Sequence, residues 1–104
     1  MEIEEALDRL EDGHAIWKVD SAKKICETLG IPFDEKLVQN FKQGGYLTLD
    51  EEGPGVDGLS LGRYAAEKFG VLGKARDFIG RGYKAREYSR LIKEELQTQG
   101  RVPR

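Results

Sequence analysis

The sequence contains one cysteine, one histidine and no long apolar run, and each shortage excludes a class of protein. Cys26 alone cannot form an internal disulfide, which fits a reducing compartment inside the cell. One cysteine and one histidine, His14, cannot supply the usual ligand set of a structural zinc site. No apolar stretch approaches the roughly 18–20 residues that cross a bilayer, and the acidic start differs from the basic start of a signal peptide. We therefore expect a cytoplasmic protein with no membrane partner, no metal and no cofactor.

Groups of residues that could form a catalytic site are equally scarce. Cys26 and His14 form the only thiol and imidazole pair, but Cys26 lies on the apolar stripe of a predicted helix, where a thiol is usually a small buried hydrophobe. Lys74 follows a glycine, as in a phosphate-binding loop, but Lys68 occupies the position of that motif's first glycine. We therefore predict that the chain is not an enzyme.

The chain has 104 residues, enough for one hydrophobic core and no second domain of ordinary size. Apolar residues recur at helical spacing in several segments. The predicted helices cover residues 3–10, 21–29, 33–43, 61–69 and 83–97. A short basic segment, 73–82, is expected to form one or two helical turns that carry Phe78 and Ile79 on an apolar side. Residues 98–104 are expected to form a flexible tail.

Three short segments favour strands. Residues 15–19 are apolar and β-prone, with Trp17 as their core anchor. Residues 45–49 and 58–61 alternate, and the intervening loop is rich in Gly, Pro and Asp, which predicts a β-hairpin with a long tip.

The order of elements through residue 70 resembles the winged helix-turn-helix family. In the terms of that family, residues 21–29 are the second helix, Gly30-Ile31-Pro32 the turn and Phe33–Gln43 the recognition helix, and the hairpin is the wing. Residues 59–66 also resemble a passage that often follows the wing in bacterial and archaeal regulators, although Ser60 replaces its threonine and one residue is missing before Gly62. The resemblance implies a mainly α fold (α+β) with a small β-hairpin wing and C-terminal helices. Residues 1–70 would form the winged-helix domain and 71–97 a basic helical extension of the same domain.

Charge is distributed unevenly along the chain. Residues 1–58 contain six Lys and Arg against fourteen Asp and Glu, a net charge of −8, whereas residues 59–104 contain eleven against five, a net charge of +6. This asymmetry indicates either a basic interaction surface, halves that attract each other within a homodimer, or two halves that neutralise each other on one fold.

The resemblance and the basic second half together predict a DNA-binding protein of the winged-helix transcription-regulator type. On the recognition helix, the side chains that could read bases in double-stranded DNA are Lys36, Gln39, Asn40, Lys42 and Gln43. The basic residues that could bind phosphates are Lys74, Arg76, Arg81, Lys84, Arg86, Arg90 and Lys93. On the last helix, Arg86, Arg90 and Lys93 are spaced to form one stripe.

The acidic half supports a different function. The predicted wing tip carries Asp50, Glu51, Glu52 and Asp57, and phosphates would repel it. The alternative is therefore a winged-helix protein-interaction module, an adaptor or subunit of a larger complex, that binds a protein partner and not DNA. The basic stripe is then a solvated helix face, or the contact of a homodimer.

Overall fold

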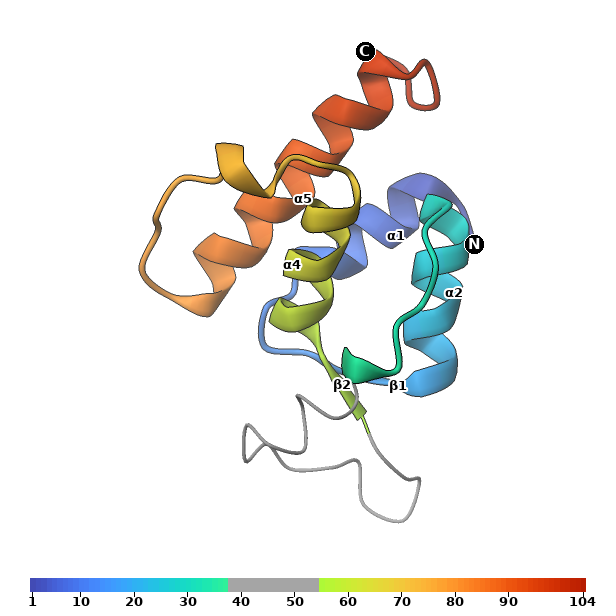
Figure 1. Ribbon diagram of the computed structural model, residues 1–104, viewed down its shortest axis with the longest axis vertical. Coiled ribbons are helices and arrows are strands. Elements are labelled where there is room, and N and C mark those ends of the chain that lie inside the picture. The colour runs from blue at the N-terminus through green and yellow to red at the C-terminus, as the bar shows by residue number, and fades with distance from the viewer. Residues whose placement is uncertain (38–54) are drawn as a thin grey trace.

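The computed structural model describes residues 1–37 and 55–104. Over these residues the elements are, in order, α1 (Ile3–Leu10), β1 (Ile16–Lys18), α2 (Val19–Leu29), β2 (Gly55–Asp57), α4 (Gly58–Lys68), the 3-10 helix η2 (Leu72–Lys74) and α5 (Arg81–Thr98) (Figure 1). The described part of the chain is thus mainly helical with one small antiparallel sheet, which confirms the predicted α+β class.

The first two helices form where the apolar stripes predict them. Each buries one face in the common core: α1 through Ala6 and Leu10, α2 through Ile25 and Leu29. Gly30 ends α2 with φ 79°, a left-handed conformation that glycine adopts without strain. The Ile31 amide then donates to the Cys26 carbonyl at 3.0 Å, which closes the helix end and turns the chain away from the helix axis.

The sheet corrects the predicted hairpin. β1 forms as expected and pairs with β2 in antiparallel register, Trp17 opposite Val56. The strand predicted at 58–61 is wrong, because these residues form the first turn of α4. The Asp57 side chain caps that turn: it accepts hydrogen bonds from the Ser60 amide at 3.2 Å and the Ser60 hydroxyl at 2.8 Å. The Asp57 cap gives a partner to a backbone N–H group of the first turn. It therefore favours a helix here, although the alternating pattern predicts a strand. The strand predicted at 45–49 lies outside the described residues.

The last helix completes the core. α5 packs against α4 and α1 and buries Leu91, Ile92 and Leu96, the inward positions that its spacing predicts. The Ser89 hydroxyl donates to the Leu7 carbonyl at 2.9 Å and so joins two helices from opposite ends of the chain. The apolar face of α5 is therefore used inside its own domain, and α5 is an integral part of that domain.

Two C-terminal expectations need correction. Within 73–82 the helical part is η2 together with the first residues of α5, while residues 75–80 carry no helix. The tail expected at 98–104 folds back onto the domain: Val102 is only 5% exposed, and the Gln97 side chain donates to the Pro103 carbonyl at 3.2 Å. Gly100, with φ 74°, turns the chain after α5, and Val102 packs in the core beyond it.

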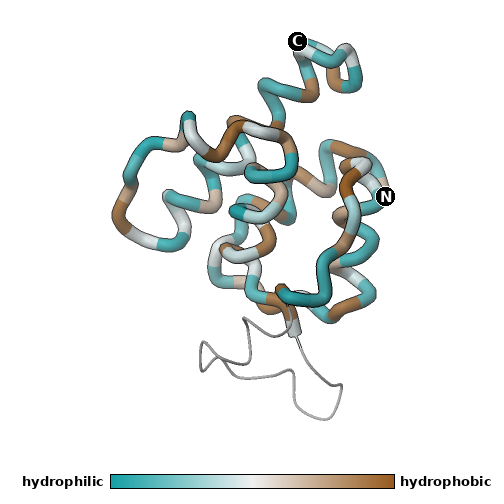
Figure 2. Tube along the Cα trace, viewed as in Figure 1, coloured by the Kyte–Doolittle hydropathy of each residue, from teal (hydrophilic) through white to brown (hydrophobic). Residues whose placement is uncertain are grey.

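No helix among the described residues is long and apolar enough to cross a membrane. Figure 2 shows hydrophobic and hydrophilic residues interspersed along the helices, as expected for helices that bury one face.

Candidate nucleic-acid interface

The predicted recognition helix begins later than expected. Phe33 precedes the helix, and Asp34 caps its first turn by accepting from the Lys36 amide at 2.9 Å. Leu37 is buried in the core and Lys36 is exposed, so this turn presents one apolar and one basic side chain to opposite sides. The remaining residues predicted to read bases, Gln39, Asn40, Lys42 and Gln43, lie outside the described residues.

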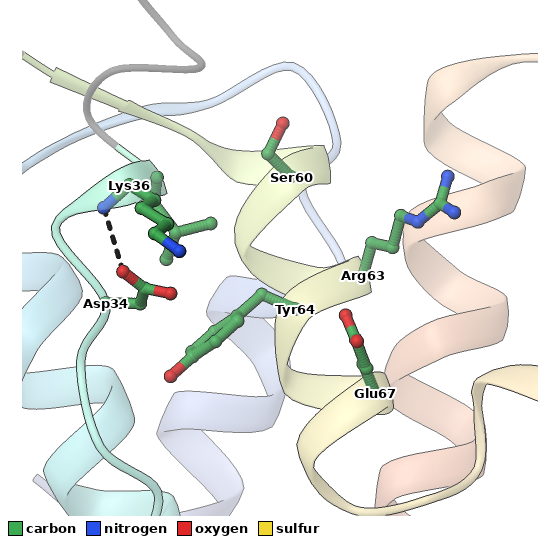
Figure 3. A pocket seen from close by; sticks show the side chains of 7 residues that line it. Asp34, Lys36, Ser60, Arg63, Tyr64 and Glu67 are labelled. Carbon is green, nitrogen blue, oxygen red and sulfur yellow. Dashed lines mark hydrogen bonds between the residues drawn. The ribbon is translucent and has the colours of Figure 1, made fainter.

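A hydrogen bond from α4 holds the turn between α2 and this helix start. The Tyr64 hydroxyl donates to the carbonyl of Pro32. Burial, more than the nearby acidic groups, raises the pKa of Tyr64, so the hydroxyl keeps its proton and stays a donor. Figure 3 shows the Tyr64 ring reaching from α4 towards the chain that carries Asp34 and Lys36. The turn is thus positioned by a side chain more than thirty residues away.

The surface beside this turn has mixed charge. A pocket there is lined by one basic and one acidic residue from each wall, Lys36 and Asp34 on one and Arg63 and Glu67 on the other (Figure 3). Both signs lie within one concave area, so the pocket does not favour either an anionic or a cationic ligand.

Arg81, one of the residues predicted to bind phosphate, is committed to an internal contact. Its guanidinium pairs with the carboxylate of Asp57 and donates through Nε to the Gly13 carbonyl at 3.0 Å. Asp57 is only 3% exposed, so this ion pair is largely shielded from water. We call the set of Gly13, Asp57 and Arg81 the buried node. It joins the α1–β1 loop, the end of β2 and the start of α5. Asp57 was expected on an exposed acidic wing tip, and that placement is wrong.

Arg90 is also paired within the chain. Its guanidinium contacts Glu87 at 2.8 Å and Glu94 at 2.6 Å. Glu87 is 4% exposed, and its second oxygen accepts from the backbone amide of Arg76 at 2.9 Å. One buried carboxylate thereby fixes both Arg90 and the loop before α5, and it reduces the positive charge that Arg90 adds to the surface.

Glu87 gives the domain a pH-dependent contribution to stability. The hydrogen bond from Arg90 lowers the pKa of Glu87, and burial opposes it only partly. A lowered pKa in the folded state stabilises the fold at pH values above the ordinary carboxyl pKa, and the contribution is lost as pH falls through the folded value. We expect Glu87→Gln to lower the free energy of unfolding by about 2 kcal/mol at pH 7, as for hydrogen bonds to charged groups.

The measurement is urea denaturation of both proteins between about pH 7 and pH 2. The difference between wild type and Glu87→Gln should shrink below about pH 4, because wild-type Glu87 then becomes neutral as well. Glu94→Gln is the matched control, since Glu94 pairs with the same arginine at an exposed site and should change stability by less than about 0.5 kcal/mol. A difference that stays constant with pH would contradict this assignment.

Five of the predicted phosphate-binding residues are exposed and Lys84 is half-buried; the exposed ones are Lys74, Arg76, Arg86, Arg90 and Lys93. The Arg86 guanidinium lies over the Tyr83 ring, 5.1 Å from its centroid. Because the apolar face of α5 faces inward, Arg86 and Lys93 point to solvent from the same side of the helix. The stripe predicted from their spacing is confirmed as an exposed face, with Arg90 engaged by its two glutamates.

The acidic residues of α1 border part of this stripe. A shallow groove between α1 and α5 is lined by Glu4, Asp8 and Glu11 on one side and by Arg90 and Lys93 on the other. The two halves of the chain therefore neutralise each other along this groove. The basic surface is least compensated at the other end of the stripe, near Arg86.

Two large side chains near that end are exposed. Ile79 is 93% exposed and Tyr83 is 60% exposed, although Phe78 and Ile79 were expected on a helical turn. Their spacing with Ala75 fits a helix, but Gly80 and Gly82 follow directly, and a segment so rich in glycine is a poor helix former. That composition was the signal that could have placed them in a loop.

Cys26 is buried, as its position on the apolar stripe predicts. Burial, with a smaller contribution from Glu27, raises the pKa of its thiol to about 11. Such a thiol is neutral at pH 7 and a weak nucleophile. Within residues 1–37 and 55–104, no group of acidic, histidine or cysteine side chains could hold a metal ion.

Comparisons of the chain with protein-family models, curated proteins and solved structures give no match. The function has to be argued from the residues themselves.

Proposed function

We propose that this protein binds double-stranded DNA as a winged helix-turn-helix transcription regulator. The observation that carries the proposal is the orientation of α5: its apolar face is buried against α1 and α4, and Arg86 and Lys93 lie on its solvent side. A helix whose basic face is turned outward by its own packing is suited to a polyanionic surface.

The winged-helix architecture is supported by three contacts. α2 ends at the Gly30 turn, a new helix begins after the Asp34 cap, and Tyr64 fixes the turn between them. β2, which follows residues 38–54, pairs with β1 and brings the end of the proposed wing beside the helix-turn-helix unit. The helix that begins after Asp34 would enter the major groove and present Lys36 and the residues predicted to read bases.

The α5 stripe matches the spacing of a nucleic-acid backbone. Arg86 and Lys93 are seven residues apart, which corresponds to about 10 Å along a helix axis. Successive phosphates on one strand rise by about 3.4 Å along the duplex, so the two cations would reach phosphates about three nucleotides apart. Such contacts hold the protein on DNA without reading sequence, and the helix after Asp34 would supply the specificity.

The test is fluorescence anisotropy of a labelled duplex of about 30 base pairs, titrated with protein across a salt series. We expect binding that is micromolar or tighter at low salt and weakens steeply as salt rises. Lys93→Ala should reduce the slope of log affinity against log salt by about one, the loss expected for one phosphate contact.

Lys24→Ala is the matched control, because Lys24 is an exposed cation on α2, across the molecule from the start of α5 (Figure 1). Its salt slope should equal that of the wild type. Equal losses in the two variants would indicate diffuse attraction and contradict the assignment of the α5 stripe. Absence of binding even at low salt would contradict the whole proposal.

The alternative, a protein-interaction module, is favoured by one observation. α1 carries the exposed acidic residues Glu4, Glu5 and Asp8, and DNA would repel this negative charge. Under this alternative, charge reversal at Glu4 and Glu5 would abolish capture of a basic protein partner and leave the fold intact. Under the same alternative, the basic stripe of α5 would be a solvated face or the contact of a homodimer.

A further inference from the structure

The loop between η2 and α5 carries the most exposed apolar side chain among the described residues. Ile79 in this loop is 93% exposed, and Tyr83, four residues later in the first turn of α5, is 60% exposed. The loop stands away from the helices at one side of the molecule (Figure 1), and Figure 2 shows hydrophobic character at its outer edge. Adjacent exposed apolar side chains of this size mark an interaction surface.

Contacts behind the loop give it a defined shape. Glu87 accepts from the Arg76 amide, and the Phe78 amide donates to the Arg76 carbonyl at 3.0 Å. The Phe78 and Tyr83 rings lie 6.3 Å apart between centroids. Gly80, directly after Ile79, has φ 100°, a backbone conformation that glycine adopts without strain. Ile79, 93% exposed, thus lies in a loop that contacts on both sides hold in place.

The surroundings of this tip are basic. Arg76 and Arg86 are exposed on either side of it, and Lys74 and Lys84 lie close by in the chain, against the single acidic residue Asp77. The Arg86 guanidinium is already placed over the Tyr83 ring. An apolar tip surrounded by cations is complementary to a ligand with anionic groups outside and apolar groups behind them. Duplex DNA is such a ligand, because its phosphates lie outside its stacked bases.

We propose that Ile79 is a wedge that inserts between base steps in the minor groove of duplex DNA, with Arg76 and Arg86 on the flanking phosphates. This inference rests on the proposed function and adds a contact separate from the α5 stripe and from the helix that begins after Asp34. Apolar wedges of this kind partly unstack a base step and kink the duplex by about 20–90°. The kink should be most favourable at flexible pyrimidine–purine steps such as TA.

Two features favour DNA over an anionic membrane. Beyond the tip, Arg86 and Lys93 lie on the solvent side of α5, and cations spaced along one helix fit a strand better than a plane. The apolar tip consists of one isoleucine and one tyrosine with Phe78 partly buried behind them. Stable anchoring in a bilayer generally requires a larger apolar area than this.

The experiment measures DNA bending by energy transfer between dyes at the two ends of a duplex of about 30 base pairs with a central TA step, together with affinity by anisotropy. Ile79→Ala should bind roughly tenfold more weakly and should lose the change in energy transfer. Ile79→Leu should keep both, because it preserves the size of the wedge. Ile79 packs against nothing in the core, so both variants should melt at the wild-type temperature.

Lys93→Ala separates this inference from the proposed function. It should weaken binding and leave the bend of the bound duplex unchanged. If Ile79→Ala binds and bends DNA like the wild type while Lys93→Ala binds more weakly, the wedge is refuted and the proposed function stands. If the wild-type protein binds no duplex at low salt, both are refuted. Ile79-dependent binding to vesicles of phosphatidylcholine and phosphatidylserine, with Ile79-independent binding to DNA, would assign the tip to lipid and overturn the wedge.

Discussion

Replacement of Asp57 with alanine is expected to lower the free energy of unfolding by about 3 kcal/mol, measured by urea denaturation at pH 7. Two losses add up in this variant. The start of α4 loses its cap at Ser60, worth about 1 kcal/mol, and Arg81 loses the carboxylate that compensates its charge at a site shielded from water. The Arg81 side chain keeps some contact with solvent, which places the estimate at the lower end of the range for buried ion pairs.

Asp57→Asn separates the two losses, because asparagine caps a helix about as well as aspartate but carries no charge. It should retain the cap and destabilise the protein by less than Asp57→Ala. Asp77→Ala is the control for removal of an exposed aspartate and should change stability by less than about 0.5 kcal/mol. If Asp57→Ala is no worse than Asp77→Ala, the buried node contributes nothing to stability.

Gly13→Ala should destabilise the protein by a similar amount, about 3 kcal/mol, for a steric reason. A Cβ at this position would lie 2.7 Å from the carbonyl carbon of Arg81 and 3.0 Å from the Cβ of Ala85, and it would also overlap the Arg81 carbonyl oxygen. The obstacle is backbone, so no side-chain rotation relieves it. The α1–β1 loop would have to move away from the start of α5, which would also weaken the hydrogen bond from Arg81 to the Gly13 carbonyl.

Gly73→Ala is the matched control, because a Cβ at Gly73 meets no atom within 4 Å. Removal of glycine flexibility there should be neutral or slightly stabilising. Thermal unfolding of the two variants side by side should show a fall of the order of 10 °C for Gly13→Ala and little change for Gly73→Ala. A Gly13→Ala protein that melts with the wild type would mean that the loop accommodates the methyl group.

The helices could be predicted from the sequence wherever an apolar stripe coincided with a glycine stop. α1, α2 and α5 follow this rule, and their inward residues are those that the spacing selects. The prediction of a strand at 58–61 was wrong. Leu59, Ser60 and Leu61 alternate between apolar and polar residues, and this pattern also occurs at the start of a helix. The cap at Asp57 decides in favour of the helix. Whether a capping residue is followed by a helix or a strand depends on tertiary packing as well as on local pattern.

Less of the candidate site than of the helices could be predicted from the sequence. Helical spacing was sufficient to place Arg86 and Lys93 on one face of α5, since that relation is local. The pairing of Arg81 with Asp57 joins residues that are 24 positions apart, and no periodicity connects them. The sequence suggests that both residues lie on the surface, because most charged residues do. Only the fold shows that these two pair inside the domain.

The position of α5 within the chain has a consequence for how the protein is made. Ile92 and Leu96 supply part of the core, Ser89 holds α1, and Arg81 anchors the sheet end, yet all of them are synthesised after every other helix. A nascent chain that has reached Gly70 therefore exposes the apolar sides of α1 and α4 on the ribosome. Chaperones that recognise exposed apolar segments should engage this intermediate and release it once residues 81–98 have emerged. Premature termination before α5 should produce a chain that is degraded or aggregates.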